Sequence, residues 1–193
     1  GCGGGLAVGQ VLAEVITHAA RLVLDADALN VIATQTPLQT LVIERSQRGL
    51  PTVLTPHPLE AARLLGLATT DIQAHRIRAA QQLAERFQCV AIVKGSGTVI
   101  AEPGQSPAVN PTGNARLATA GTGDVLAGMV GARWAAGASA LQAATGAVYA
   151  TSMGGGHSAR AAPTRQPPSC SSESKSATLP AISVAWAIAA QRP

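Results

Sequence analysis

The chain has 193 residues, 47% of them hydrophobic and 12% charged, so we expect one folded domain with a real core and exclude a disordered chain. Aromatic residues make up only 2%, and the core must therefore be built from Ala, Leu, Val and Ile. Residues 1–150 carry ten Lys and Arg against nine Asp and Glu, so the formal charge of +4 comes mostly from the tail and no nucleic-acid partner is expected.

The cysteines and the apolar runs limit the class of protein further. Cys2, Cys89 and Cys170 are far apart and form no Cys-x-x-Cys motif, so neither a disulfide framework nor a zinc site is expected. Cys89 begins an apolar run and should be a buried thiol. No apolar stretch is long enough to span a membrane, and the first residues lack the basic and apolar parts of a signal peptide. We therefore expect a cytoplasmic protein without a membrane partner.

The first part of the chain alternates helical and strand patterns. It opens with a glycine-rich loop, Gly1 to Gly5, which could hold a phosphate or simply turn the chain. Apolar residues at helical spacing predict helices over residues 6–20, 38–48 and 59–65. A glycine follows the second and the third of these runs and marks the end of the helix. Short continuous apolar runs predict strands, buried on both faces, over residues 22–25 and 52–55.

The pattern continues to about residue 151. Asp71 can cap a helix whose apolar face runs from Ile72 to Phe87. A third buried strand follows Cys89, and Pro103-Gly104 is typical of the turn of a hairpin. We expect the strand over residues 89–93, the hairpin arms over 99–101 and 108–109, and helices over 125–135 and 139–151.

This alternation of short buried strands and amphipathic helices indicates an α/β fold with a mostly parallel sheet. Ligands of such sheets bind at the carboxyl ends of the strands. Polar clusters occur at these ends, and we expect four of them to converge on one edge of the sheet: Asp25, Asp27 and Asn30; His57; Lys94 to Thr98; and Asn110 to Asp124.

Gly121-Thr-Gly-Asp124 is the central candidate among these clusters. It joins the turn at Asn110 to Asn114 to a helical run, and a small-residue loop at a helix N-terminus offers free N–H groups and the positive end of the helix dipole to an anion. Asp124 lies in the first helical turn. Local chemistry leaves two interpretations, a simple helix cap or a catalytic base beside a bound phosphate.

The other clusters also have two interpretations each. Lys94-Gly-Ser-Gly-Thr98 has the composition of a nucleotide loop but is not a Walker A motif, and Lys94 could equally be a solvated cation. His57 lies between two prolines, which hold it rigidly, and could be a ligand-binding or a surface side chain. Asp25 and Asp27 could hold hydrated magnesium with phosphates, although helix capping is the simpler role for Asp27.

Residues 152–193 depart from this pattern. Met153 to Ser176 is rich in Gly, Ala, Arg, Pro and Ser without periodicity, and Thr178 to Ala190 could form a final helix. We therefore divide the chain into a domain over residues 1–151 and an atypical low-complexity tail over 152–193. The tail is either a linker with a docked helix or a degraded coding stretch.

Four motifs, in this order, resemble the ADP-dependent (S)-NAD(P)H-hydrate dehydratase family, which has a ribokinase-like fold. The motifs are Leu24-Asp-Ala-Asp-Ala-Leu-Asn30, Leu54-Thr-Pro-His-Pro-Leu-Glu to Gly66, Val93-Lys-Gly-Ser-Gly-Thr to Ala101, and Asn110-Pro-Thr-Gly-Asn with Gly-Thr-Gly-Asp124-Val-Leu-Ala-Gly128. The resemblance covers residues 1 to about 150 and implies a three-layer fold. The family has strands and helices before its glycine loop that this sequence lacks, so we expect a partial domain.

The resemblance also implies roles for particular residues. The adenine nucleotide would contact Lys94, Gly95, Ser96, Gly97, Thr98 and Gly123, and the N–H groups of Gly121, Thr122 and Gly123 would stabilise the transferring phosphoryl group. The hydrated cofactor would contact His57, Asp124 and a glycine of the first loop, Gly3 or Gly5. Asn110 and Asn114 would orient it. No protein-held metal site is implied, because Mg²⁺ would bridge the phosphates.

By the same resemblance, the activity would be repair of NADHX and NADPHX, which carry water across a double bond of the nicotinamide ring, with ADP or ATP as co-substrate. Phosphorylation of the ring hydroxyl would turn it into a good leaving group, with Asp124 as general base. A homo-oligomer is expected. The alternatives are a vitamin-precursor kinase of the same fold and a non-catalytic nucleotide-binding remnant.

Overall fold

The computed structural model describes residues 6–112 and 121–154, and a five-stranded sheet forms its centre. The strands lie in the order β1-β2-β3-β4-β5, and β1, β2 and β3 are parallel, while β4 and β5 form an antiparallel hairpin beside β3. The strands are β1 (Leu22–Leu24), β2 (Thr52–Leu54), β3 (Val90–Val93), β4 (Val99–Ala101) and β5 (Ala108–Val109). The predicted α/β fold with a parallel central sheet is confirmed.

Alternation along the parallel strands divides the core between the two faces of the sheet. Leu22 and Leu24 of β1 pack into one hydrophobic cluster, whereas Val23 between them packs into the other. In the next strand Leu54 belongs to the first cluster and Val53 to the second. Both faces must therefore be covered by helices, and every residue of these three strands is buried.

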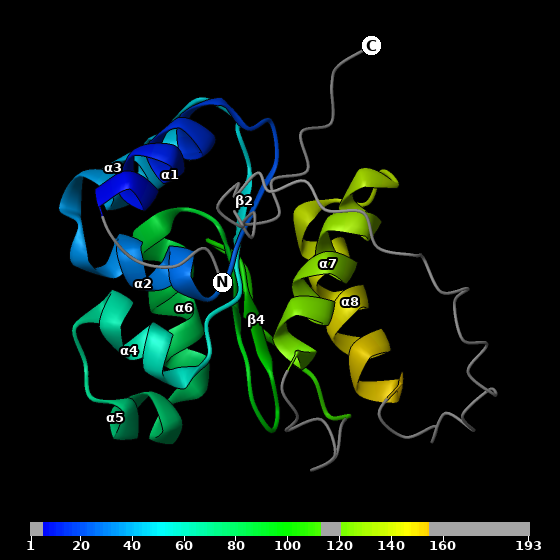
Figure 1. Ribbon diagram of the computed structural model, residues 1–193. Helices are drawn as coiled ribbons and strands as arrows, with labels where there is room; N and C mark the ends of the chain where they lie inside the picture. Colours follow the sequence, from blue (N-terminus) through cyan, green and yellow to red (C-terminus); the bar gives the residue numbers. More distant parts are fainter. Residues whose placement is uncertain (1–5, 113–120, 155–193) are drawn as a thin grey trace, which may run out of the picture.

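Helices on the two sides of the sheet make a three-layer arrangement (Figure 1). The larger layer comes from the first half of the chain, and the smaller one comes from its end. The first layer contains α1 (Leu6–His18), α2 (Asp27–Thr34), α3 (Thr36–Gln47), α4 (Pro58–Leu65), α5 (Thr69–Ala74) and α6 (Arg76–Phe87). The second layer contains α7 (Thr122–Ala135) and α8 (Ala140–Gly154).

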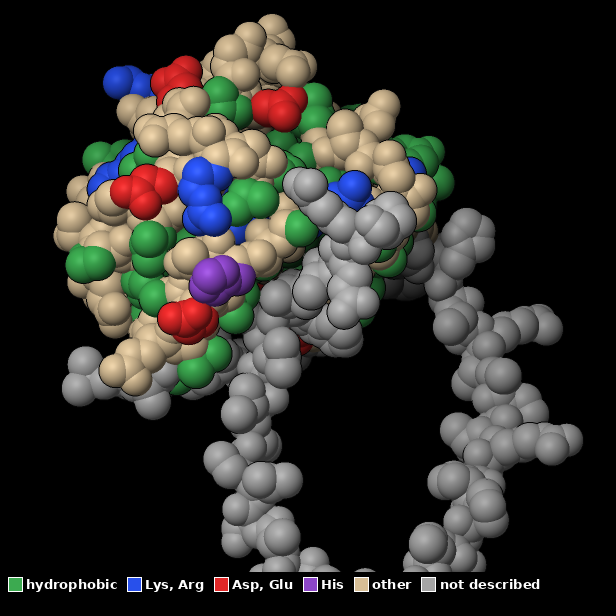
Figure 2. Space-filling model, turned by 90° about the horizontal axis from the view of Figure 1, so that it is seen from above, with side chains coloured by type: hydrophobic (Ala, Val, Ile, Leu, Met, Phe, Trp, Pro, Cys, Tyr) green, Lys and Arg blue, Asp and Glu red, His purple; other side chains and the backbone are tan. Residues whose placement is uncertain are grey.

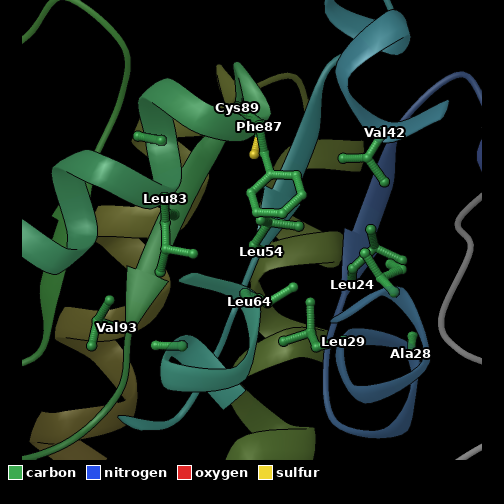
Figure 3. Packing of buried hydrophobic residues seen from close by; sticks show 14 of the residues in the cluster. Leu24, Ala28, Leu29, Val42, Leu54, Leu64, Leu83, Phe87, Cys89 and Val93 are labelled. Atoms are coloured by element: carbon green, nitrogen blue, oxygen red, sulfur yellow. The ribbon is translucent and has the colours of Figure 1, made fainter. Parts of the chain in front are cut away.

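The larger cluster is built mainly from leucine and alanine, as the composition predicts, around the single phenylalanine of the chain. Phe87, the last residue of α6, is fully buried. Figure 3 shows its ring beside Leu54 of β2, with Leu83 of the same helix close by. Cys89 is buried in this cluster too, and burial strongly raises the pKa of its thiol, which confirms the expectation of a core cysteine.

Several predicted boundaries differ from the structure. The helix expected from Asp71 to Phe87 is two helices, because the backbone of His75 (φ −131°, ψ 49°) leaves the helical region between α5 and α6. Asp71 is not a cap: it lies inside the first turn of α5, and Ala68 is the N-cap. The first helix ends at His18, and α7 begins at Thr122, earlier than expected. Helix α2 was not predicted as a separate element.

Arg45 of α3 is completely buried, and it joins its own helix to α1 and to strand β2. Its guanidinium group donates hydrogen bonds to Thr52 Oγ1 (2.8 Å) and to the carbonyl of Ile16 in the last turn of α1. Helix C-termini favour cations, so the charge is placed where the helix dipole stabilises it. Burial, and then the nearby Arg48, lower the pKa of Arg45 to about 10. Arg45 thus links α3 to β2 and to α1.

Figure 2 shows a face on which Lys, Arg, Asp and Glu side chains stand in small separate groups among uncharged atoms. Among the described residues, none of the helices combines the length and the apolar character that crossing a bilayer requires.

The central position of Phe87 leads to a stability prediction. Phe87→Ala should lower the free energy of unfolding by about 3–5 kcal/mol, because it removes a buried ring and leaves a cavity. Urea unfolding followed by circular dichroism measures this. Ile77→Ala on the same helix is the control, since Ile77 is 51% exposed and should cost less than about 1 kcal/mol. Similar costs for both variants would contradict the central packing of Phe87.

Candidate active site

A cavity of about 480 Å³ lies where the predicted polar clusters meet. It is bounded by the segments that follow β2, β3 and β5 and by the two helices of the second layer. Its lining residues are His57, Lys94, Gly95, Ser96, Gly97, Thr98, Asn110, Pro111, Thr112, Thr122, Gly123, Leu126, Val148, Thr151 and Ser152. Nine of the predicted site residues are in this set, so the expected convergence at one edge of the sheet is observed.

Lys94, which lines the cavity, forms an ion pair with Asp25, which does not. Lys94 follows β3 and Asp25 follows β1, and the distance from Lys94 Nζ to Asp25 Oδ1 is 2.6 Å. The two side chains are only 19% and 14% exposed, so Lys94 is not the freely solvated cation of the simpler interpretation. Gly123 packs against the pair: a Cβ placed there would lie 3.3 Å from Nζ of Lys94. The pair therefore brings β1, β3 and α7 together.

The chain turns sharply just after Asp25. Ala26 has a φ of 50°, a conformation that is uncommon for a residue with a side chain, and its N–H donates to Asp25 Oδ1 at 2.9 Å. Ala26, and not Asp27, is the N-cap of α2, whereas Asp27 is the first helical residue. Asn30 lies one turn further, where its Oδ1 accepts a hydrogen bond from Arg63 of α4 (2.6 Å). Of this cluster, Asp25 is the residue that meets Lys94.

His57 serves as the N-cap of α4. Its Nδ1 accepts hydrogen bonds from the N–H groups of Leu59 (3.1 Å) and Glu60 (3.4 Å), so the neutral ring carries its proton on Nε2. Nε2 lies 3.2 Å from Glu60 Oε1, and Glu60 Oε2 accepts the N–H of His57 at 2.8 Å. His57 is therefore held in one orientation, at the wall of the cavity, and is not a mobile surface side chain.

Glu60 is a buried carboxylate that the sequence analysis did not single out. It is 3% exposed, and burial raises its pKa above the ordinary value of 4.5, although the hydrogen bond from the His57 backbone and the nearby Lys94 act in the opposite direction. The pattern His-x-x-Glu at a helix start is a capping box, and this pattern could have identified it.

Asn110 ties the end of the hairpin to α8. Its side-chain amide donates to Ser152 Oγ (3.0 Å) and to the carbonyl of Thr112 (3.0 Å). Thr112 Oγ1 donates to Asn110 Oδ1 at 2.9 Å and lies 2.6 Å from Ser152 Oγ. The network uses both ends of the Asn110 amide. Asn110 thus shapes the cavity wall, and no sequence pattern pointed to Ser152 as its partner.

The Gly121 to Asp124 segment forms the N-terminus of α7, as expected. Gly121 is the N-cap with a φ of 87°, a conformation that favours glycine, and Thr122 and Gly123 line the cavity. Asp124 is the third residue of the helix and is exposed; it follows Gly123 in the chain but is not among the lining residues of the cavity. The structure therefore places it near the site without assigning it a contact.

Three predicted ligand contacts lie outside the described residues. These are Gly3 and Gly5 of the first loop and Asn114 of the turn before α7. Their proposed roles remain predictions from the sequence. The same applies to the tail beyond Gly154, so the predicted division of the chain at residue 151 also stays a prediction.

Metal-ligating side chains are sparse in the described part of the chain. Within residues 6–112 and 121–154, no group of three or more His, Cys, Asp or Glu side chains could enclose a metal. The Asp25 carboxylate is already paired with Lys94. Mg²⁺ in nucleotide sites keeps several waters and takes one or two carboxylates besides the phosphates, and this demands no protein cage.

Comparison with known proteins adds an independent line of evidence. The family model described as NAD(P)H-hydrate dehydratase matches residues 1–176. The ADP-dependent (S)-NAD(P)H-hydrate dehydratase of Neisseria meningitidis is 42% identical over 148 residues, which are 75% of this chain and 49% of that protein. The bifunctional NAD(P)H-hydrate repair enzyme Nnr of Moorella thermoacetica is 49% identical over 108 residues, or 56% of this chain and 19% of that one.

Solved structures of similar fold point to the same family as the sequence comparisons. The ADP/ATP-dependent NAD(P)H-hydrate dehydratase of Bacillus subtilis, co-crystallised with ATP and Mg²⁺, superposes with a TM-score of 0.63 at 32% identity, covering 76% of this chain and 49% of that one. Bacillus subtilis YxkO gives a TM-score of 0.67 at 35% identity, covering 77% and 52%. The chain thus spans about half the length, or less, of these relatives.

The buried carboxyl of Glu60 leads to a pH prediction. As the pH rises above 4.5, the unfolded chain releases the Glu60 proton before the folded protein does, so the folded protein loses stability. Glu60→Gln cannot ionise. Its stability relative to the wild type should therefore improve between about pH 4 and pH 7, as measured by urea unfolding. Glu85→Gln, on the exposed side of α6, is the control for loss of a carboxylate. A relative cost of Glu60→Gln that grows with pH would contradict the assignment.

Proposed function

The chain belongs to the NAD(P)H-hydrate dehydratase family, and on this basis we propose that it repairs hydrated nicotinamide cofactors. The reaction is the dehydration of (S)-NADHX or (S)-NADPHX to NADH or NADPH, with ADP or ATP consumed. The observation that carries this proposal is the cavity at the carboxyl edge of the sheet. Lys94, the glycine loop after it and the N-terminus of α7 all line it.

The cavity has the chemistry that a nucleotide requires. The Lys94 ammonium group, although paired with Asp25, has further N–H donors for a phosphate. The N-terminus of α7 supplies N–H groups and the positive end of a helix dipole, at Gly121, Thr122 and Gly123. Leu126 and Val148 make part of the same wall apolar and suit a purine ring. We therefore assign the Lys94 to Thr98 loop and Gly123 to the adenine nucleotide.

The hydrated cofactor would approach from the side of His57 and Asp124. His57 is fixed by its helix cap and presents an oriented ring at the cavity wall. Asp124 is next to Gly123 and exposed, so a substrate entering from solvent can reach it. Asn110 shapes another part of the wall through Ser152, and Gly3, Gly5 and Asn114 complete the set by resemblance.

The chemistry follows from the poor leaving ability of hydroxide. The ring hydroxyl oxygen attacks the terminal phosphorus of the nucleotide, the bond from that phosphorus to the bridging oxygen breaks, and Asp124 accepts the hydroxyl proton. The carbon–oxygen bond then breaks as the ring nitrogen donates its lone pair, and inorganic phosphate leaves with the bonding electrons. Loss of a proton from the adjacent ring carbon restores the double bond.

Several groups together would stabilise the negative charge of the phosphates. Bound Mg²⁺ would neutralise phosphate charge during phosphoryl transfer. Lys94 would hold the phosphates while the N–H groups at Gly121 to Gly123 take up the charge that develops on the phosphoryl oxygens. A homo-oligomer and a cytoplasmic location remain predictions.

A vitamin-precursor kinase and a non-catalytic remnant differ from this proposal in their products. A kinase leaves the phosphoryl group on its substrate, whereas the dehydratase releases inorganic phosphate and restores the absorbance of reduced nicotinamide. A remnant would be stabilised thermally by nucleotide without turnover. Incubation of the chain with NADHX, ADP and Mg²⁺, followed by both product assays, tests the dehydratase directly, and a thermal melt with ADP tests nucleotide binding without turnover. A stable phosphorylated product, or no turnover, would overturn the proposal.

The role of Asp124 is tested separately. Asp124→Asn keeps the size of the side chain but cannot accept the proton, so kcat should fall by about 100-fold to 10,000-fold while nucleotide affinity stays nearly unchanged. Asp71→Asn, an exposed carboxylate in the first turn of α5, is the matched control and should keep full activity. Wild-type activity in Asp124→Asn would refute the base assignment.

A further inference from the structure

Arg76 contacts the backbone of the glycine loop from behind the cavity. It is the first residue of α6, and its Nη1 donates to the carbonyl of Ser96 at 2.7 Å. Its Nη2 donates to the carbonyls of Lys94 at 2.8 Å and of Val93 at 3.3 Å. One guanidinium group therefore binds three carbonyls between the end of β3 and the middle of the loop.

The local position of Arg76 is unfavourable for a cation. The N-terminus of a helix is the positive end of its dipole, and the first turn of α6 contains no acidic residue. Burial lowers the pKa of Arg76, and its Nε is buried without a partner in the described part of the chain. Helix formation alone would not select arginine at this position, so the loop carbonyls are the contacts that hold it.

Gly95 lies directly against Arg76. It has a φ of 137°, a conformation that favours glycine, and a Cβ placed on it would lie 2.6 Å and 2.7 Å from the two terminal nitrogens of Arg76. A larger residue at position 95 would therefore displace the guanidinium group from its present position. The loop backbone and the guanidinium group are in direct contact.

The contacts fix the direction of two loop amides. In a trans peptide the N–H points opposite to the preceding carbonyl. The carbonyls of Lys94 and Ser96 point at Arg76, so the N–H groups of Gly95 and Gly97 point away from it. Arg76 does not line the cavity, whereas Gly95 and Gly97 do. Among the described residues, neither N–H donates a backbone hydrogen bond outside helices and strands.

We propose that Arg76 is a positioning residue that turns the amides of Gly95 and Gly97 toward the cavity, where they bind an anionic group of the nucleotide. The inference rests on the proposed function for the identity of the ligand. The orientation of the loop by Arg76 does not depend on it. Backbone N–H groups that a turn directs to one side are an established way of binding phosphate.

The experiment compares Arg76→Met, Arg76→Lys and the control Arg78→Met in the full chain. Arg78 lies on the same helix, outside the cavity lining. Amide hydrogen exchange of the peptide covering residues 94–98, read by mass spectrometry, reports the loop, and titration with ADP and Mg²⁺ reports binding. Exchange elsewhere in α6 and β3 reports global stability. Arg76→Lys serves as the conservative variant if Arg76→Met does not fold.

We expect Arg76→Met to increase exchange in the loop alone and to weaken ADP binding about 10-fold to 100-fold. Arg76→Lys should lie in between, because one ammonium group cannot span the carbonyls as a planar fork does. Arg78→Met should match the wild type. The proposal would be overturned if loop exchange and ADP affinity were unchanged in Arg76→Met, or in Arg76→Lys if only that variant folds. It would also be overturned if Arg78→Met lost as much ADP affinity as Arg76→Met.

The two proposals fail in distinguishable ways. If the wild-type chain binds no ADP, the proposed function fails, while faster exchange confined to residues 94–98 would still support Arg76 as the residue that orients the loop. If ADP binds and Arg76→Met loses affinity only through a general rise in exchange, Arg76 has a structural role and the positioning proposal is wrong.

Discussion

The ion pair between Asp25 and Lys94 joins the carboxyl ends of two strands that are not neighbours in the sheet. β2 lies between them, and its own end is tied to both sides: Thr55 N–H donates to the Leu24 carbonyl (3.0 Å), and Lys94 N–H donates to the Pro56 carbonyl (2.9 Å). A largely buried pair of this kind loses much of its hydration, so it stabilises the fold only if both partners stay in place. It also fixes where α7 approaches, because Gly123 packs against it without a side chain.

The rest of the site follows from this constraint. With the strand ends held together, the loop after β3 is placed beside the N-terminus of α7, and His57 at the start of α4 lines the same space. The site is also supported from outside the cavity, by Arg76 behind the loop and by Glu60 behind His57. The reacting groups would therefore be oriented before any ligand arrives, which is how enzymes reduce the cost of reorganisation during phosphoryl transfer.

Much of this arrangement could be predicted from the sequence. Short runs of Val, Leu and Ile indicated the strands, because strands buried on both faces are uniformly apolar, and the known behaviour of parallel sheets placed Lys94, His57 and Gly123 at one edge. Pairings between distant residues could not be predicted. In the sequence the Asp25 carboxylate suits magnesium as well as it suits a lysine, and neither Ser152 nor Arg76 lies in a recognisable motif. The break at His75 was missed because the apolar face continues across it, so periodicity alone gives no boundary.

The most direct test of the central role of the ion pair is a double-mutant cycle, with Asp25→Asn, Lys94→Met and the two combined. Urea unfolding measures the free energy of unfolding of the wild type and of each variant. We expect both single variants to be destabilised and the double variant to be more stable than the sum of the two losses, with a coupling of at least about 1 kcal/mol, because each single change leaves a poorly hydrated charge without its partner. Losses that simply add would show that the two side chains act independently and would contradict a structural dependence of the site on the pair.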